Sequence, residues 1–255
     1  MIRALLARIQ QKHRTIGYPK TEPQLPERFC GKPEINRTNC SKNCKLCIEI
    51  CPVAALKKEN NVLTIDMGKC LFCSQCANTC PESAIKFSSD YRLTTRNRSD
   101  LILSKNEINL AAALDKKMKS LFGRSLKLRQ VSAGGCNACE ADTNVLGTVG
   151  FDLGRFGIQF VASPRHADGL LITGPVPENM KLALQKTYDA VSHPKIVIAV
   201  GACAISGGIY ENHSQVNNGA EIIVPIDLYI PGCPPHPMTI LDGLLRLLGK
   251  IENEK

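Results

Sequence analysis

The 255-residue sequence lacks tryptophan altogether, and its seven phenylalanines and five tyrosines make up only 5% of the chain. Proteins that bind single-stranded nucleic acids stack bases on aromatic side chains placed between basic ones. Much of the net charge of +9 lies between Arg92 and Arg129, a stretch that offers no aromatic platform. A nucleic-acid partner is therefore not expected, and these basic residues are predicted to contact acidic neighbours or solvent.

Long apolar runs are also missing, since no stretch approaches the roughly 20 consecutive apolar residues that span a bilayer. Residues 1–29 are expected to form a peripheral segment that opens with a short basic amphipathic helix, whose apolar face contains Ile2, Leu5, Leu6 and Ile9. It is too short for the apolar core of a secretory signal and lacks a small-residue cleavage site, so we expect it to be retained. Contact with a membrane surface and packing on a partner subunit both remain open.

Cysteine, by contrast, is abundant, with 13 residues in a chain that has no secretory signal. A reducing cytosol keeps thiols free, so these cysteines are expected to bind metal rather than form disulfides. The odd total also argues against complete pairing. A cytoplasmic protein with bound metal is the prediction.

Two cysteine runs repeat 29 residues apart and predict [4Fe–4S] clusters. Each has the Cys-x2-Cys spacing and the final Cys-Pro of ferredoxin ligand runs, at residues 40–52 and 70–81. In two-cluster ferredoxins the fourth cysteine of each run ligates the other cluster. We therefore expect one cluster on Cys40, Cys44, Cys47 and Cys80, and a second on Cys51, Cys70, Cys73 and Cys76.

One departure from the pattern leaves ligation by Cys40 open, because three residues rather than two separate it from Cys44. Structural zinc is the alternative cofactor for paired Cys-x2-Cys motifs. It is disfavoured because tetrahedral zinc needs neither a third cysteine nor a proline at a fixed offset.

The fold class expected for residues 30–98 is an α+β, two-[4Fe–4S] ferredoxin-like domain, with strands at 62–65 and 84–87. The segments 52–56 and 81–85 are expected to be short helices that open with proline. Within a linker spanning residues 99–124, the apolar spacing predicts a helix from 104 to 121 that ends at Gly123.

Residues 125–255 have the alternating pattern of an α/β, flavodoxin-like domain with a parallel sheet. Its strands are predicted at 125–131, 158–162, 170–173, 196–200 and 226–230. Four further cysteines lie just after strand ends, where open α/β sheets bind ligands. They predict a third [4Fe–4S] site made of Cys136, Cys139, Cys203 and Cys233, which leaves Cys30 as an incidental thiol.

The motifs around the third site resemble the small subunit of membrane-bound, energy-converting [NiFe] hydrogenases of the formate hydrogenlyase type. They lie at residues 135–140, 163–168, 201–208 and 230–235. The related subunit of respiratory complex I shares most of them but normally has two adjacent cysteines, where this chain has Cys136-x2-Cys139. Residues 29–34, 68–73 and 84–91 resemble the two-cluster ferredoxin subunit of the same complexes, in an order that suggests a natural fusion.

The resemblance implies an electron-transfer subunit with three clusters and no complete active site. A [NiFe] hydrogenase-like large subunit would complete the site, and membrane subunits would pump ions or anchor the complex at the cytoplasmic face of the inner membrane. The upstream donor would be formate dehydrogenase, carbon monoxide dehydrogenase or ferredoxin. The rival hypotheses are a complex I-related subunit without nickel and a structural zinc or nucleic-acid-binding protein.

Glu140, next to Cys139, is the candidate for tuning the third cluster or relaying protons. The alternative is that it is simply an acidic residue at the start of a helix. Arg165 and His166 lie in a segment that resembles the part of the family facing the partner. No catalytic role is predicted for them.

Overall fold

A five-stranded parallel sheet organises the C-terminal half in a computed structural model that describes residues 2–12, 14–41, 43–123 and 125–251. Its strand order is β10-β9-β8-β6-β7, and all four neighbouring pairs are parallel. The strands are β6 (Leu126–Ser132), β7 (Ile158–Phe160), β8 (Gly169–Thr173), β9 (Ile196–Val200) and β10 (Leu228–Ile230). The predicted parallel α/β sheet is confirmed, and the adjacent inner strands β8 and β9 are buried throughout, as their continuous apolar runs require.

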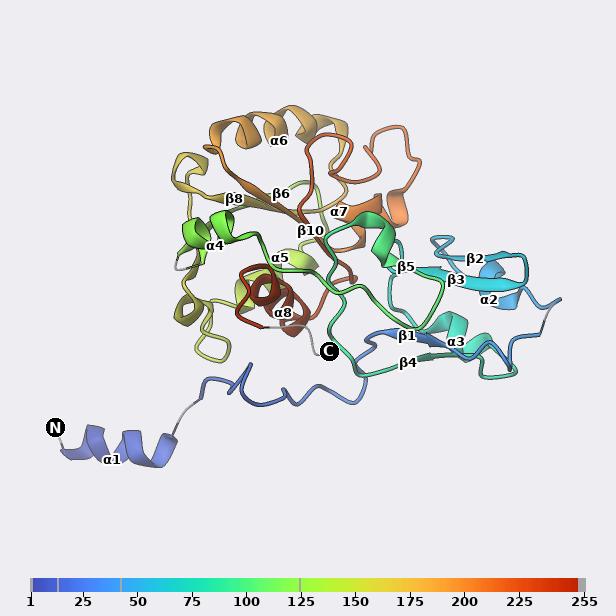
Figure 1. Cartoon of the computed structure of the whole chain (residues 1–255), viewed down its shortest axis with the longest axis horizontal. Helices are drawn as coiled ribbons and strands as arrows, with labels where there is room; N and C mark the ends of the chain where they lie inside the picture. The colour runs from blue at the N-terminus through green and yellow to red at the C-terminus, as the bar shows by residue number, and fades with distance from the viewer. Residues whose placement is uncertain (1, 13, 42, 124, 252–255) are drawn as a thin grey trace.

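Helices cover both faces of this sheet (Figure 1). On one face α6 (Glu178–Ala190) packs its buried Leu184 against Ile172 and Val197. On the other lie α5 (Ala138–Val145) and α8 (Pro237–Leu247), and α8 is buried along its whole length. Residues 202–206 form the short helix α7, which follows β9 directly. The carboxyl ends of β6, β9 and β10 therefore lead straight into the cysteine-bearing loops.

The N-terminal half contains the ferredoxin-like unit, which lies beside the sheet in Figure 1. Two antiparallel sheets build it, and the strands expected near 62–65 and 84–87 are confirmed. The first sheet pairs β1 (Pro33–Ile35) with β4 (Ile85–Phe87), and the second joins β2 (Leu56–Glu59), β3 (Val62–Asp66) and β5 (Ile102–Leu103). Two short helices, α2 (Leu46–Glu49) and α3 (Gln75–Thr79), carry cysteines on the inner side.

The prediction of a short helix after each Cys-Pro pair is wrong. Segments 52–56 and 81–85 form turns that run into β2 and β4. Ala54 and Ser83 have φ angles of 47° and 48°, a left-handed conformation that ends any right-handed helix. These two residues occupy equivalent places in the duplicated halves, so the duplication preserves the turn.

The prediction of a long linker helix is also wrong, because within residues 104–121, all of which the structure describes, only the part in α4 (Lys116–Phe122) is helical. Asp115 caps α4 by accepting a hydrogen bond from the Met118 amide at 2.8 Å, and Gly123 follows its end as expected. Before α4 the chain is extended and hydrogen-bonds across α8, with the Leu114 amide donating to the Leu247 carbonyl at 2.9 Å. The apolar residues that suggested a helix, such as Ala111 and Leu114, are buried against α8 instead.

Several contacts brace the two units against each other. Thr95 forms an isolated antiparallel bridge with Tyr229 of β10. Lys69, next to Cys70, forms an ion pair with Glu211 of the sheet domain. Met67 and Leu101 share one buried cluster with Ala204, Ile205 and Tyr229. The loops that carry cysteines in the two units are thereby held in a fixed relation.

The N-terminal segment follows a confirmed helix, α1 (Ile2–Gln11), and then packs on α8. The Tyr18 hydroxyl donates to Asp242 Oδ1 at 2.7 Å, and Arg246 Nε donates to Asp242 Oδ2 at 2.8 Å. Both charged side chains are buried. Tyr91 lies edge-on to Tyr18, with ring centroids 5.9 Å apart, so the segment is tied to both units. Within the described residues no helix is long and apolar enough to cross a bilayer.

Replacing Tyr18 with phenylalanine is expected to lower the free energy of unfolding by about 1.5–3 kcal/mol, because it removes a buried hydrogen bond to a charged group. For a chain of this size the melting temperature should fall by roughly 3–10 °C. Thermal unfolding followed by circular dichroism measures it. The same substitution at the half-exposed Tyr210 is the control and should leave the melting temperature unchanged.

Candidate metal centres

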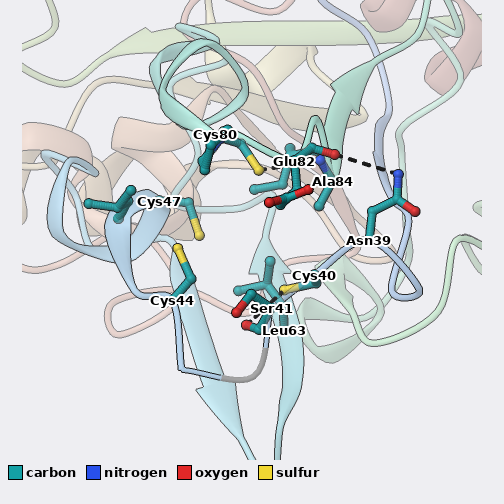
Figure 2. Close-up of a pocket in the computed structure, with 12 residues that line it drawn as sticks. Asn39, Cys40, Ser41, Cys44, Cys47, Leu63, Cys80, Glu82 and Ala84 are labelled. Atoms are coloured by element: carbon teal, nitrogen blue, oxygen red, sulfur yellow. Dashed lines mark hydrogen bonds between the residues drawn. The ribbon is translucent and has the colours of Figure 1, made fainter.

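The first group of thiols surrounds a cavity of about 190 Å³ in the ferredoxin-like unit. Its four cysteines come from both runs, as the crossed pattern predicts, and are Cys40, Cys44, Cys47 and Cys80 (Figure 2). Burial, followed by the charges of Cys40, Cys44 and Cys80, raises the pKa of Cys47, which indicates that the four sulfurs lie within electrostatic reach. Cys40 lines the cavity despite its wider spacing, and Lys58 Nζ donates to its sulfur at 3.7 Å.

The second group lines a smaller cavity of about 20 Å³ in the same unit. It contains Cys51 from the first run together with Cys70, Cys73 and Cys76 from the second. Burial raises the pKa of Cys70 to about 12. Burial, then the charges of Cys51 and Cys73, raises the pKa of Cys76 to about 11. Without a bound metal, Cys70 and Cys76 would therefore stay protonated at neutral pH.

Backbone amides are already aimed at the sulfurs, which is a direct test of whether these cavities suit thiolate ligands. Ala55 N–H donates to Cys51 Sγ and Ala84 N–H donates to Cys80 Sγ, each at 3.3 Å. The two contacts are equivalent under the 29-residue repeat. Phe72 N–H makes a third contact of 3.3 Å, with Cys70 Sγ. Hydrogen bonds of this kind stabilise cluster thiolates and help to set the reduction potential, so the donor set fits iron–sulfur clusters.

The third group lies at the carboxyl edge of the parallel sheet. Cys136 precedes α5, Cys139 lies in its first turn, Cys203 lies in α7, and Cys233 follows β10. Burial, then the charges of Cys203, Glu140, Cys233 and Cys136, raises the pKa of Cys139 well above its usual range. Burial and the charges of Cys233 and Cys136 raise the pKa of Cys203 to about 11. Four thiols thus crowd together at one edge, and positively charged iron would offset their repulsion.

Two glycines let the backbone approach these sulfurs closely. Gly201 has a φ of +88°, and a Cβ there would lie 2.6 Å from Cys139 Sγ. Gly208 has a φ of +59°, and a Cβ there would lie 2.7 Å from Cys203 Sγ. A side chain at either position would need both a strained backbone and a displaced thiol.

Glu140 is buried in the first turn of α5, directly behind the third group. Its Oε1 accepts hydrogen bonds from Ser132 Oγ at 2.7 Å and Thr173 Oγ1 at 2.6 Å. Burial acts to raise the pKa of Glu140, but the hydrogen bonds from Thr173 and Ser132 outweigh it and lower the pKa. The carboxylate is therefore ionised at neutral pH, next to the thiols.

The two hydroxyl donors to Glu140 do not emerge from the motif search. Ser132 and Thr173 end β6 and β8 and face each other in the strand register. Polar residues at the carboxyl ends of parallel strands are the signal that could have identified them. Glu140 also lines a cavity of about 550 Å³ between α5 and α6, together with residues such as Arg129, Asn144 and Thr187.

The three groups are arranged in series, and one pair of neighbouring cysteines lies at each of the two junctions between them. Cys47 of the first group adds to the rise in the pKa of Cys76, after burial and the charges of Cys51 and Cys73. Burial and the charge of Cys136 raise the pKa of Cys233, and Cys73 from the ferredoxin-like unit adds to it. The second group is thus the neighbour of both others.

One cysteine, Cys30, and the segment of Arg165 and His166 lie outside these groups. Cys30 Sγ lies 3.0 Å from Ser74 Oγ and lines neither ferredoxin cavity. Arg165 and His166 are exposed on a single turn, Pro164–His166. Among the described residues, no three of His, Cys, Asp and Glu are close enough to share a single metal ion. A [4Fe–4S] cluster does not need such convergence, because each of its four irons takes one cysteine thiolate.

Sequence comparison identifies the protein family to which this chain is related. Residues 136–247 match the NADH ubiquinone oxidoreductase 20 kDa subunit, and residues 63–86 match the 4Fe-4S binding domain. Over 141 residues the chain is 39% identical to a probable membrane-bound hydrogenase subunit of Pyrococcus furiosus, a match that covers 54% of this chain and 84% of that protein. The chain belongs to the 20 kDa subunit family.

Relatives in the 20 kDa subunit family come from two kinds of oxidoreductase. Formate hydrogenlyase subunit 7 of Escherichia coli is 43% identical over 57% of this chain, and the match spans only 56% of that relative. An NADH-quinone oxidoreductase subunit of Citrifermentans bemidjiense is 45% identical over 48% of this chain and 71% of its own length. A solved chain of the archaeal membrane-bound sulfane sulfur reductase shares 34% identity, with a TM-score of 0.47, over 56% of this chain and 78% of its own.

The 20 kDa subunit domain and the 4Fe-4S binding domain occur here in one chain, ferredoxin segment first. The predicted resemblance to hydrogenase and complex I subunits is confirmed by these relatives. This combination is that of an electron-transfer subunit of an oxidoreductase complex, and the bound group that the 4Fe-4S match supports is an iron–sulfur cluster.

Proposed function

We propose that this chain relays electrons through three [4Fe–4S] clusters to a [NiFe] hydrogenase-like large subunit. The observation that carries the proposal is the row of three four-thiol groups, in which Cys47 lies near Cys76 and Cys73 lies near Cys233. Each cluster, when bound, would take up and pass on one electron. Twelve cysteines would hold them, namely Cys40, Cys44, Cys47, Cys80; Cys51, Cys70, Cys73, Cys76; and Cys136, Cys139, Cys203, Cys233.

The residues of this chain contribute position and electrostatics. Backbone amides of Ala55, Phe72 and Ala84 would donate to ligand sulfurs. Apolar side chains such as Leu63 and Ile85 line the first cavity and would keep water from that cluster. Both effects set reduction potentials in iron–sulfur proteins.

The third site is the proposed exit toward the partner. Cys136 and Cys233 are exposed at the carboxyl edge of the sheet. In the ferredoxin-like unit Cys70 and Cys76 are buried, and the exposed Cys73 is the ligand that lies near Cys233. A large subunit docking on this edge would cover the exposed thiols and complete the active site. The formate hydrogenlyase and membrane-bound hydrogenase relatives support a hydrogenase partner in a membrane-bound complex. We further propose membrane subunits at the cytoplasmic face and a donor such as formate dehydrogenase, carbon monoxide dehydrogenase or ferredoxin.

A complex I-like subunit that reduces a quinone without nickel is the second candidate. It is supported by the relatives that are NADH-quinone oxidoreductase subunits. The Cys136-x2-Cys139 spacing favours the hydrogenase type, because the complex I subunits that this chain resembles normally carry two adjacent cysteines.

Anaerobic purification of the chain with its co-encoded partners tests the proposal. The expected preparation is brown, holds about four irons and four sulfides for each of the three sites, and contains nickel in the large subunit. Iron and sulfide without nickel would favour the complex I-like candidate. A colourless, zinc-containing preparation would contradict both.

Glu140 is proposed to tune the third cluster through its charge. Its replacement by glutamine should raise the midpoint potential of that cluster by on the order of 50 mV, because a nearby negative charge favours the oxidised state. Redox titration followed by electron paramagnetic resonance measures it. An unchanged potential whose pH dependence is lost would instead assign Glu140 to proton relay.

Asp142 provides the matched control for Glu140. It lies two residues further along α5, and side chains two apart point to different sides of a helix. Asp142→Asn should leave the potential unchanged. Equal shifts in the two variants would contradict a specific role for Glu140.

A further inference from the structure

Helix α1 exposes an apolar face that no other described part of the chain covers. None of its residues is buried, and Figure 1 shows it standing clear of both units. Four large apolar side chains are exposed by 53–75%: Ile2, Leu5, Leu6 and Ile9. Apolar side chains clustered in this way indicate a surface that becomes buried in a complex or at a membrane.

The arrangement around the helix axis is that of an interfacial helix. At about 100° per residue, Ile2, Leu5, Leu6 and Ile9 span roughly a quarter of the circumference. Arg3 and Arg8 flank this stripe, each about 110° from its centre and on opposite sides. Long arginine side chains in these places can extend their charged ends toward phosphate while the stripe enters the apolar layer.

The charge of this region has one sign. Residues 1–21 contain Arg3, Arg8, Lys12, Arg14 and Lys20 and no aspartate or glutamate. A helix that packs on another protein through ion pairs commonly carries both signs along its edges. An unmixed positive charge beside an apolar stripe complements an anionic lipid surface instead.

The small size of the apolar face also favours a lipid surface over a protein partner. A stable protein interface needs about 800 Å² per partner, with a pocket for a central anchor. Four aliphatic side chains on a ten-residue helix offer less, and none is aromatic. A lipid surface needs no complementary shape, so this stripe is sufficient for it.

We propose that α1 binds the surface of a membrane that contains anionic phospholipid. The segment that follows α1 is fixed to the loop after α5 by two hydrogen bonds. Thr15 Oγ1 donates to the Val149 carbonyl, and Ile16 N–H donates to the Gly150 carbonyl, each at 2.9 Å. Val149 in this loop is 71% exposed.

The test is vesicle binding by the full-length protein with its clusters loaded, measured by co-sedimentation. Vesicles of phosphatidylcholine with about one third phosphatidylglycerol are compared with vesicles of phosphatidylcholine alone. The wild-type protein should bind the anionic vesicles at least tenfold more tightly, and high salt should weaken that binding. Equal binding to both vesicle types, or binding to neither, would overturn the proposal.

Leu5→Glu should reduce binding to anionic vesicles at least tenfold. Its matched control is Leu182→Glu on α6, since Leu5 and Leu182 are 64% and 63% exposed. Helix α6 lies on the far side of the molecule from α1 (Figure 1). The control should bind like wild type. An equal loss in both variants would show that added charge alone weakens binding and would overturn the assignment to α1.

Reversing the charge of α1 distinguishes a lipid surface from a protein as the partner that α1 binds. Arg3→Glu with Arg8→Glu should abolish binding to anionic vesicles, whereas Lys186→Glu on α6 should not. Cluster absorbance confirms that each variant is folded. If the partner subunits alone, in detergent and without lipid, protect α1 from hydrogen exchange as strongly as vesicles do, a protein occupant replaces the lipid surface.

Discussion

Replacing Cys80 with alanine is expected to remove about one third of the iron and sulfide. Although Cys80 belongs to the second cysteine run, the cluster that is lost should be the one held by the first run. Cys80 lies four residues after Cys76 in the sequence, yet it lines the cavity of Cys40, Cys44 and Cys47. The electron paramagnetic resonance signal of the first site should disappear, while that of the second site remains.

Double variants make this expectation sharp. Cys80→Ala combined with Cys44→Ala should lose no more iron than Cys80→Ala alone, because both thiols belong to one site. Cys80→Ala combined with Cys73→Ala should lose about two thirds of the iron, because two sites are then incomplete. The reverse pattern of losses would contradict the crossed assignment.

Cys30→Ala serves as the control for all of these variants. Its sulfur contacts Ser74 but lines neither ferredoxin cavity. The variant should keep the full iron and sulfide content and all three cluster signals. Loss of one cluster from it would mean that Cys30 replaces a proposed ligand.

Gly201→Ala is expected to remove the third cluster and to reduce electron delivery to the partner by more than about a hundredfold. The backbone there is left-handed, which costs an alanine about 1 kcal/mol or more. The added methyl would also lie 2.6 Å from Cys139 Sγ and displace the thiol. Both ferredoxin-type clusters should remain, because Gly201 contacts neither of their cavities.

The measurements are iron content and the rate of hydrogen evolution by the assembled complex with a chemical reductant. Gly147→Ala is the control. A Cβ at Gly147 would meet nothing closer than the Asn144 carbonyl oxygen at 3.4 Å. It should be as active as wild type. A fully loaded, active Gly201→Ala protein would contradict the placement of Cys139 at the third site.

The parallel sheet and the grouping of cysteines could be predicted because they depend on patterns that the chain carries locally. Continuous apolar runs such as Ile196–Val200 can be buried on both faces only in a covered sheet. Cysteines that follow strand ends must then meet at one edge. The 29-residue repeat similarly fixes which ferredoxin cysteines are equivalent.

The errors arise where tertiary contacts override local preference. Ala111 and Leu114 have helical spacing, but burying them along α8 in an extended path stabilises the fold more than a helix at this place would. Ala54 and Ser83 adopt a left-handed backbone conformation that alanine and serine disfavour. The residue types therefore do not predict these turns. The hydroxyl donors to Glu140 could not be foreseen, since the pairing of Ser132 with Thr173 depends on which strands become neighbours.

The bracing between the two units, through the Thr95–Tyr229 bridge and the Lys69–Glu211 ion pair, has a consequence for how the relay depends on concentration. Two separate subunits would have to meet before an electron could cross from one to the other, and dilution would slow that step. Here the Cys73 and Cys233 loops belong to one folded chain, so their encounter is intramolecular. The crossing between the second and third sites should therefore proceed at the same rate at any dilution.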